Sequence, residues 1–295
     1  MDVKTAFLYG PIDQELYVVM PKGYEEAGKV CRLKKALYGL KQSPRIWYET
    51  LSKFLLEKLG LHHLHADHSI FATSKGWKGL IISAYVDDTK IIHKDIAVVN
   101  RAKAELKAAF QMIDLRPISF YLGITVTRDR TKKKITLSQR AYLIKALERF
   151  GLRKANTSPV PIKHSIELVA NQETTSEDDV RRYQSMVGSV MFPMIETRPD
   201  IAFAVSTVSR FAHNPTSTHI TAVRLILQYL AGSLDRGITY GGDENLDLTP
   251  IGFSDADWGR DKTTRRSVSG FVFMLNGEPI SWKSKLQATV SLSTC

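Results

Sequence analysis

Two adjacent aspartates, Asp87 and Asp88, interrupt a mostly apolar run in the stretch IISAYVDDTKIIHK. Two like charges side by side repel each other, so an opposite charge is needed to compensate for them. A divalent cation such as Mg²⁺ prefers carboxylate oxygen and would bridge the pair. Two-metal phosphoryl transfer uses such a cluster, with ions about 4 Å apart and roughly three carboxylates on neighbouring strands. The pair therefore indicates phosphoryl-transfer chemistry if a third aspartate lies close by.

The alternative for this pair is an exposed turn that binds no ligand, because a dipeptide motif often matches by accident. Its surroundings favour a hairpin. β-rich runs at 69–73 and 79–86, separated by the turn-like SKGWK, precede the aspartates, and a further run at 89–93 follows them. This pattern predicts three strands, with both carboxylates at the last turn.

A helix is predicted just upstream, from the stretch SPRIWYETLSKFLLEKLG. Ser43 is expected at the N-cap, Pro44 at the first helical position and Gly60 just past the end. The apolar side chains of this stretch fall on one helical face. They are Trp47, Leu51, Phe54 and Leu55.

The remaining patterns mix strands and helices, so the fold class expected is α+β. In the first half they are a helix at 97–110, a hairpin of 120–127 and 133–137, and a helix at 138–150 before Gly151. Two prolines and then a polar, acidic stretch predict a linker at about 155–178 that ends in a helix N-cap. Helices are then expected near 179–195, 199–212 and 217–231, and short strands at 249–258, 267–275 and 279–284.

Composition narrows the class of partner. The 295 residues are 43% hydrophobic and carry a formal net charge of +11, which favours a nucleic acid over an acidic protein or a membrane surface. Cys31 and Cys295 are too few for a disulfide framework or a four-thiolate metal site, so a reducing compartment is expected. The most apolar run, 79–86, is far shorter than the ~20 residues of a membrane helix, and no targeting segment is visible.

The YVDD hairpin resembles the catalytic hairpin of reverse transcriptases, and its flanking segments resemble the copia-type retrotransposon branch. MDVKTAFLYG is similar to that family's first catalytic motif, and CRLKKALYGLKQSPRIWYE to its template-strand segment. FYLGITV is similar to its primer-contacting hairpin, and GSVMFPMIETRPDIAFAVSTVSRFAHNPTSTH to the helical region after the palm. GFSDADW and RRSVSGFVFMLNGEPISWKSK are similar to the opening of the attached ribonuclease H domain. The resemblance covers nearly the whole chain in family order.

This resemblance implies an α+β reverse-transcriptase palm with the fingers largely missing, a helical thumb or connection, and a partial ribonuclease H-like sheet. The expected divisions are a palm at 1–155, a linker at 156–178, the thumb or connection at 179–240 and the truncated ribonuclease H-like domain at 241–295. The implied activity is RNA-directed DNA polymerisation by two-metal nucleotidyl transfer. Its implied partners are an RNA template, a DNA primer, deoxynucleotide triphosphates and other parts of a retrotransposon polyprotein, without a membrane. The location expected is intracellular, either cytoplasmic in a virus-like particle or nuclear.

Site residues carry over from the family motifs. Asp2, Asp87 and Asp88 match the carboxylates that hold two Mg²⁺ ions. Phe7 matches the aromatic residue that selects deoxynucleotides, although an ordinary core Phe is the alternative. The residues that match template and primer contacts are Gly39, Lys41, Ser43, Pro44, Arg45, Leu122 and Gly123. With Lys34 and Lys35, the basic side chains would meet phosphates without reading bases; a solvated charged face is the alternative for each.

Asp255 matches the first acidic residue of the ribonuclease H site, and Asp257 is the weaker candidate. A plain turn aspartate is the alternative role for Asp255. A separate cluster of four histidines in LHHLHADHSI lacks a distant Cys or His pair, so a zinc site is not expected there.

Departures from the family pattern lower the activity expected. Only Met1 precedes Asp2, so we expect this ligand to have almost no strand pairing, with a cationic α-amino group beside the metal site. Asp255 alone would not hold two metals, so ribonuclease H cleavage is not expected. We expect weak or absent primer extension. The alternatives are a non-catalytic nucleic-acid-binding remnant and a structural protein with no nucleic-acid role.

Overall fold

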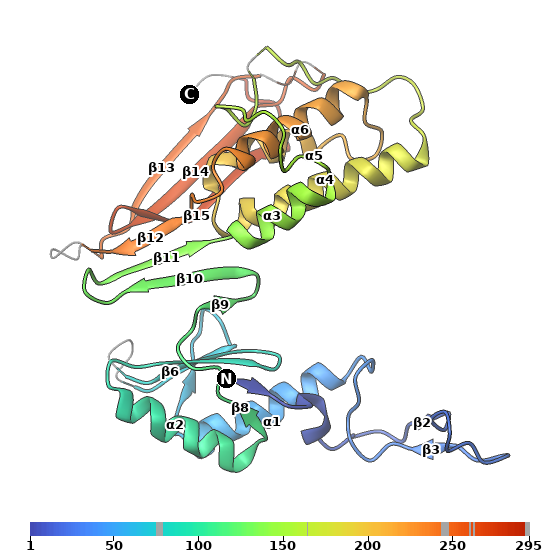
Figure 1. Cartoon of the computed structure of the whole chain (residues 1–295), viewed down its shortest axis with the longest axis vertical. Coiled ribbons are helices and arrows are strands. Elements are labelled where there is room, and N and C mark those ends of the chain that lie inside the picture. Colours follow the sequence, from blue (N-terminus) through green and yellow to red (C-terminus); the bar gives the residue numbers. More distant parts are fainter. Residues whose placement is uncertain (75–78, 164, 243–247, 260, 262, 293–295) are drawn as a thin grey trace. The chain divides into compact units, whose positions relative to one another are not determined.

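The structure is a computed structural model that describes residues 1–74, 79–163, 165–242, 248–259, 261 and 263–292. It contains two compact units, Met1–Pro117 (unit 1) and Ile118–Cys295 (unit 2), shown in Figure 1. The predicted divisions at 155, 178 and 240 are functional ones and stay predictions. Residues 75–78 of the expected SKGWK turn, His164 of the expected linker, and Cys295 lie outside the described residues. Within them, Cys31 is a free thiol.

The described residues of unit 1 form an antiparallel sheet in the order β4-β5-β6-β7-β1-β8. The strands are β1 (Asp2–Val3), β4 (His62–His63), β5 (Ile70–Ala72), β6 (Ile81–Tyr85), β7 (Asp88–Ile92) and β8 (Met112–Ile113). The predicted strands before and after Asp87 and Asp88 are confirmed as β5, β6 and β7. The two-residue strands β1, β4 and β8 were not predicted, because two residues carry no readable alternation.

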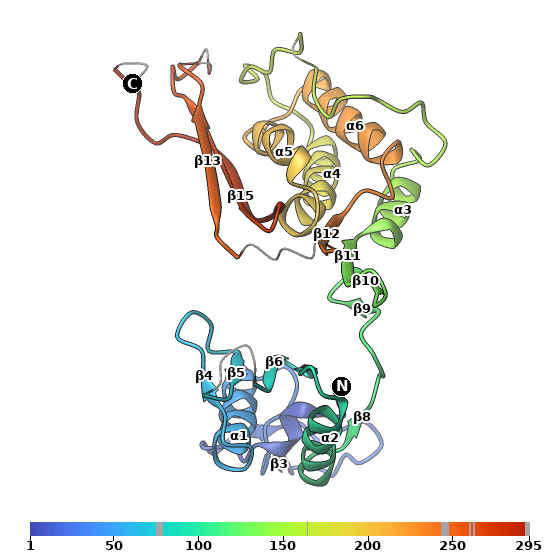
Figure 2. The ribbon, with the colours of Figure 1, turned by 90° about the vertical axis from the view of Figure 1, so that its left-hand side faces the viewer.

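Two helices, α1 (Ser43–Glu57) and α2 (Ile96–Ala109), lie together on one face of this sheet (Figure 2). Their apolar faces and the inward-facing strand residues share one core. Its fully buried members include Leu55, Phe71, Ile82 and Leu106. No described helix of unit 1 covers the other face of this sheet, which is called the open face below.

The α1 helix was predicted, with errors at its two ends. Ser43 was expected at the N-cap, but Gln42 occupies that position and makes no side-chain cap hydrogen bond. The Ser43 hydroxyl is buried and donates instead to the Leu37 carbonyl at 2.6 Å, which holds the preceding loop against the helix. Pro44 was expected at the first helical position but is the second helical residue, because the helix starts at Ser43. Gly60, with φ of +61°, lies three residues after the helix ends at Glu57 and not directly past its end. The α2 helix lies within one residue of its prediction and is capped by Asp95, which accepts from the Ala97 amide at 2.8 Å.

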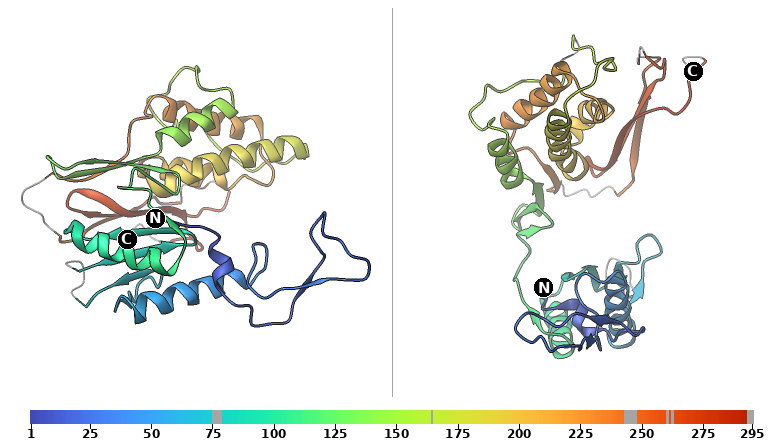
Figure 3. Two further views of the ribbon diagram at one scale, coloured as in Figure 1. Left: turned by 60° about the horizontal axis from the view of Figure 1, so that its bottom comes forward. Right: turned by 90° about the vertical axis from the view of Figure 1, so that its right-hand side faces the viewer.

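The segment between β1 and α1 forms a short 3₁₀ helix, η1 (Ala6–Tyr9), and a small hairpin of β2 (Tyr17–Val18) and β3 (Cys31–Arg32). Figure 3 shows this hairpin extending away from the sheet of unit 1. Its side chains are mostly exposed, so it contributes little to the core.

In unit 2, the described strands form a four-stranded sheet, β12-β11-β10-β9, and a three-stranded sheet, β13-β14-β15. They are β9 (Phe120–Tyr121), β10 (Ile124–Asp129), β11 (Lys134–Ser138), β12 (Ile238–Gly241), β13 (Ile251–Ala256), β14 (Val268–Leu275) and β15 (Glu278–Leu286). The predicted hairpin at 120–137 and the three predicted C-terminal strands are confirmed. The β12 strand was missed, because the whole region to 240 was expected to be helical. Every described residue of β13 is exposed, so this strand forms an open edge.

The described helices of unit 2 pack around a second core (Figure 2). They are α3 (Arg140–Arg149), α4 (Glu177–Glu196), η3 (Pro199–Ile201), α5 (Ala202–Ser209) and α6 (Ser217–Ala231). The helix predicted at 199–212 is divided into η3 and α5 and ends three residues early. The α4 helix is capped by Ser176, where the polar linker was expected to end. None of the described helices is long and apolar enough to span a membrane.

A buried arginine, Arg198, connects η3 to the segment that follows α6. The Arg198 side chain is 1% exposed. It donates two hydrogen bonds to the Asp200 carboxylate, from Nε at 2.9 Å and from Nη2 at 2.7 Å. It also donates to the Ser233 carbonyl at 3.0 Å, while the Tyr229 hydroxyl donates to Asp200 at 2.7 Å. Burial alone would raise the pKa of Asp200, but these hydrogen bonds and the Arg198 charge lower it. Arg198 therefore supplies the positive charge and two of the hydrogen bonds that compensate the Asp200 carboxylate.

Replacing Arg198 is therefore expected to destabilise unit 2 far more than replacing an exposed arginine. Arg198→Met should lower the free energy of unfolding by about 3 kcal/mol, because it leaves Asp200 without its buried partner. The matched control is Arg181→Met on α4, where Arg181 is 67% exposed and pairs with Glu177 and Asp178; it should change stability by less than about 1 kcal/mol. Urea denaturation followed by circular dichroism measures both. Equal losses in the two variants would contradict a structural role for the network.

Candidate active site

The pairing of β1 with β7 places Asp2 beside the hairpin that carries Asp87 and Asp88. Asp2 on β1 lies directly opposite Asp88 on β7 in an antiparallel pair. The flanking hydrogen bonds run from the Val3 amide to the Asp87 carbonyl at 2.9 Å and from the Thr89 amide to the Met1 carbonyl at 2.7 Å. Asp2 and Asp88 thus form a pair with no hydrogen bond between them, the arrangement in which opposite side chains come closest.

Both carboxylates lie on the open face of the sheet. Their neighbours Val3 and Thr89 are each 2% exposed and point into the core under α1 and α2. Because side chains alternate along a strand, Asp2 and Asp88 point the other way. The open face can therefore receive a ligand without disturbing the core.

The strand pairing of Asp2 corrects one expectation. We expected almost no pairing so near the first residue, but Asp2 is paired on both sides, with Asp88 of β7 and with Ile113 of β8. The Met1 amino group donates to the Thr89 carbonyl at 2.7 Å, and burial lowers its pKa despite the nearby charges of Asp114 and Asp88. Two neighbouring strands hold Asp2 because β1 is an interior strand of the sheet.

The turn that presents Asp87 is strained. Tyr85 pairs with Asp88, so Val86 and Asp87 form a two-residue hairpin loop. Val86 has φ of +51°, whereas Asp87 does not have positive φ, a pattern typical of type II′ turns. A β-branched residue in this region is an outlier that costs about 1–3 kcal/mol and persists only where its surroundings enforce it.

Electrostatic repulsion is visible at Asp87. Burial raises the pKa of this carboxyl, and the negative charges of Asp2 and Asp88 raise it further. On the same strand, burial lowers the pKa of Lys90, while the charge of Asp88 opposes that shift. The charges of Asp2 and Asp88 thus both act on Asp87.

Oxygen donors of this kind suit a hard divalent cation. Within the described ranges, however, no set of three or more His, Cys, Asp or Glu side chains is arranged to hold a metal ion. The backbone register brings the three aspartates together, but their side chains do not converge on one point in this conformation. The chemistry of the donors fits Mg²⁺, and metal binding would require side-chain rotation.

Phe7 is 9% exposed and belongs to the core cluster of unit 1. Its ring lies against that of Tyr38, with 4.5 Å between centroids. Burial, then the charge of Asp87 and, more weakly, that of Asp2 raise the pKa of Tyr38, while a hydrogen bond with the Ala6 backbone opposes them. Tyr38 was missed from the sequence; its place beside Gly39, in the segment that resembles the template-strand motif, was the available signal.

The predicted template residues surround the start of α1. Gly39 has φ of +95° with open space where a Cβ would lie, so the turn requires glycine for its conformation and not for lack of room. Lys41 and Pro44 are exposed. Arg45 is exposed and pairs with Asp13 at 2.9 Å and with Glu49 at 4.0 Å. Exposed ion pairs of this kind contribute little to stability.

The other predicted residues lie in unit 2 and are described by themselves. Leu122 and Gly123 have φ of +47° and +84° in the turn between β9 and β10. A Cβ on Gly123 would lie 3.0 Å from the Phe192 ring, so the turn is tightly packed. Asp255 is exposed on β13, and Asp257 accepts from the Val268 amide at 2.7 Å, which is a structural role. The primer-contact and ribonuclease H assignments stay predictions.

The histidine cluster is engaged in local contacts. The His63 Nδ1 atom lies 3.0 Å from the His68 carbonyl, and its ring packs on Phe71 with 4.7 Å between centroids. The Tyr48 hydroxyl donates to the same His68 carbonyl at 3.0 Å. These contacts fix the loop before β5.

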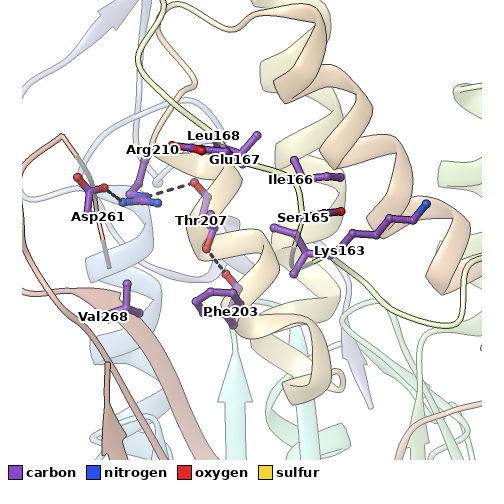
Figure 4. Close-up of a pocket in the computed structure, with 11 residues that line it drawn as sticks. Lys163, Ser165, Ile166, Glu167, Leu168, Phe203, Thr207, Arg210, Asp261 and Val268 are labelled. Carbon is purple, nitrogen blue, oxygen red and sulfur yellow. Dashed lines mark hydrogen bonds and ion pairs between the residues drawn. The ribbon is translucent and has the colours of Figure 1, made fainter. Parts of the chain in front are cut away.

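A pocket of about 520 Å³ in unit 2 was not predicted from the sequence (Figure 4). One wall is the segment that contains Lys163 and Glu167, and the opposite wall is α5, with Phe203 and Thr207. Arg210 pairs with Asp261 at its edge. This ion pair joins α5 to the segment before β14.

Comparison with known proteins identifies the family of this chain. Residues 1–164 match the family model described as reverse transcriptase (RNA-dependent DNA polymerase). Over its full length the chain is 40% identical to the retrovirus-related Pol polyprotein from transposon TNT 1-94 of Nicotiana tabacum and 36% identical to that from transposon RE1 of Arabidopsis thaliana. It covers 22% and 20% of those two proteins, about a fifth of their length. It is also 32% identical to the putative transposon Ty5-1 protein of Saccharomyces cerevisiae, over 97% of this chain and 92% of that protein.

The helices and antiparallel sheets define a fold of the α+β class, and the comparisons define the family. The chain belongs to the reverse transcriptase (RNA-dependent DNA polymerase) family found in the Pol polyproteins of copia-type transposons.

Repulsion among the aspartates predicts that Asp87→Asn stabilises unit 1 at pH 7 when a chelator is present. Unfolded, the Asp87 carboxyl ionises near pH 3.8; folded, it ionises at higher pH, so stability is lost as the pH rises through that interval. The gain should reach about 1 kcal/mol, the size of solvent-screened charge interactions, and should vanish below pH 3.8. Urea denaturation at several pH values measures it.

The matched control is Asp114→Asn, where the expected sign is opposite. Hydrogen bonds from the Arg116 amide and from Lys103 hold the pKa of Asp114 below its ordinary value, so neutralising this residue should destabilise unit 1 at pH 7. A loss of stability in Asp87→Asn at pH 7 would contradict the clustering of like charges.

Proposed function

We propose that this chain carries the palm of an RNA-directed DNA polymerase of a copia-type retrotransposon and performs nucleotidyl transfer. The observation that carries the proposal is the register that sets Asp2 opposite Asp88, with Asp87 beside them on the hairpin turn. Membership of the reverse transcriptase family supports it independently. The proposed substrates are a primer, an RNA template and deoxynucleotide triphosphates.

In the proposed reaction, the primer 3′-oxygen forms a bond to the α-phosphorus of the nucleotide, and pyrophosphate leaves. Asp2, Asp87 and Asp88 would hold two Mg²⁺ ions on the open face of the sheet. The chemistry that bound Mg²⁺ supplies is activation of the primer hydroxyl and stabilisation of charge on the leaving group. Positioning is the protein's other contribution, because phosphoryl transfer asks little covalent chemistry of it.

Residues around α1 are proposed to orient the template and the nucleotide. Lys41 and Arg45 lie at the start of the helix, where they would contact phosphates without reading bases. Phe7, packed against Tyr38, would form the wall beside the sugar. Its burial equally suits an ordinary core residue, so its role in nucleotide selection rests on the family resemblance.

For unit 2 we propose a helical thumb or connection, formed by α4 to α6, and an opening part of a ribonuclease H-like sheet, formed by β13 to β15. The three-stranded order β13-β14-β15 and the place of Asp255 on β13 support the second assignment. Other parts of a Pol polyprotein are the proposed partners, since the plant relatives are far longer than this chain.

Primer extension tests the proposal. On poly(rA) with an oligo(dT) primer and Mg²⁺, the native chain should add deoxythymidine only weakly, as expected from the sequence. Asp87→Asn/Asp88→Asn should extend at least ~100-fold more slowly still, because the ions lose two of three ligands. The charge-matched control is Asp178→Asn/Asp235→Asn, at two exposed aspartates of unit 2, which should extend like the native chain. Equal extension by native chain and active-site variant would contradict the assignment.

A second candidate function is non-catalytic binding of nucleic acid. The net charge of +11 supports electrostatic binding that weakens as salt is added. Salt-sensitive binding of an RNA–DNA hybrid without metal-dependent extension would support this binding function and contradict the polymerase function.

A further inference from the structure

A tryptophan on α1 reaches the turn that carries Asp87. The Trp47 indole Nε1 donates to the Val86 carbonyl at 2.7 Å, although the two residues are 39 positions apart in the chain. Trp47 is 2% exposed, so this hydrogen bond starts from the packed interior of unit 1. It is a side-chain contact from the helical layer to the loop between β6 and β7.

Val86, whose carbonyl accepts this hydrogen bond, is the strained residue of the loop. Val86 has φ of +51°, which a β-branched side chain rarely adopts. Its side chain is 43% exposed and contributes little packing to hold the loop. A hydrogen bond to its carbonyl is therefore well placed to keep the loop in the conformation that presents Asp87 and Asp88.

The donating end is fixed by aromatic packing. The centroid of the Trp47 ring lies 5.9 Å from that of the Tyr9 ring. It lies 5.4 Å from that of the Phe110 ring, and these two rings pack edge to face. Tyr9 accepts a hydrogen bond from the Gln111 amide at 2.5 Å, next to β8. The indole thus packs against η1, which follows Asp2 in the chain, and against the segment that leads into β8, a strand paired with β1.

We propose that Trp47 is a positioning residue of the nucleotidyl-transfer site: its indole N–H fixes the Val86 carbonyl and thereby sets the Asp87–Asp88 turn against Asp2. The inference rests on the proposed function of these aspartates. Trp47 does not contact substrate or metal in this role, and it acts through the turn. Its effect should appear as lost order in the turn and as lost kcat, and not as weakened nucleotide binding.

Atomic replacement of the indole N–H separates this hydrogen bond from packing. At position 47, 3-benzothienylalanine keeps the size of the ring and replaces N–H by sulfur, whereas 5-fluorotryptophan keeps the N–H. Trp47→Phe is the genetically simple version. The matched control is Trp282→Phe in unit 2, where the indole also donates to a backbone carbonyl, that of Met194, at 2.7 Å.

Hydrogen exchange of the unliganded chain is the first readout. Val3 and residues 86–89 should exchange about five- to tenfold faster with benzothienylalanine, the factor expected for one lost hydrogen bond. Amides inside α1 should keep native rates, which excludes general unfolding. The 5-fluorotryptophan chain and Trp282→Phe should match the native turn. Native exchange at Val3 and residues 86–89 with benzothienylalanine would overturn the inference.

Single-nucleotide primer extension is the second readout. With benzothienylalanine, kcat should fall at least ~10-fold while KM for the nucleotide changes less than ~2-fold, because misplaced carboxylates impair the chemical step. Faster exchange with unchanged kcat would reduce Trp47 to a structural role. If the native chain extends no primer, the proposed function fails, and Mn²⁺ affinity measured by electron paramagnetic resonance decides the inference instead. A ~10-fold weakening with benzothienylalanine supports the positioning role of Trp47, and equal affinity overturns it.

Discussion

The antiparallel pairing of β1 with β7 is the constraint on which the candidate site depends. Hydrogen bonds between Met1 and Thr89 and between Val3 and Asp87 leave Asp2 opposite Asp88 on the open face. A slip of one residue would turn Asp2 into the core and Val3 outward, so burial of Val3 fixes the register. Packing of α1 and α2 on the other face thus determines where the carboxylates point.

Clustering of the aspartates is opposed by electrostatics and maintained by the rest of unit 1. Burial and two neighbouring charges raise the pKa of Asp87, and Val86 holds an unfavourable backbone conformation beside it. Functional sites commonly retain such strain because the surrounding structure enforces it. Three features of unit 1 hold the aspartates in place here: the interior position of β1 in the sheet, the core below the sheet and the hydrogen bond from the Trp47 indole.

Local patterns in the sequence predicted the parts of this arrangement that depend on neighbouring residues. The β-rich runs before and after Asp87 predicted the hairpin, and the apolar face from Trp47 to Leu55 predicted α1. Features that depend on distant residues were not predictable in this way. The pairing of Asp2 on both sides, the Ser43 hydroxyl bond to Leu37 and the contact of Trp47 with Val86 arise only when remote segments meet. The role of Asp2 came from family resemblance and not from its own surroundings.

The central claim is that Asp2 and Asp88 share divalent ions, and a double-mutant cycle on Mn²⁺ affinity tests it most directly. The native chain, Asp2→Asn, Asp88→Asn and the double variant would be titrated with Mn²⁺ under electron paramagnetic resonance. Residues that act on one ion show coupling of about 0.5–3 kcal/mol, so the double variant should lose clearly less affinity than the sum of the single losses. Strictly additive losses, or native affinity in either single variant, would contradict a shared site.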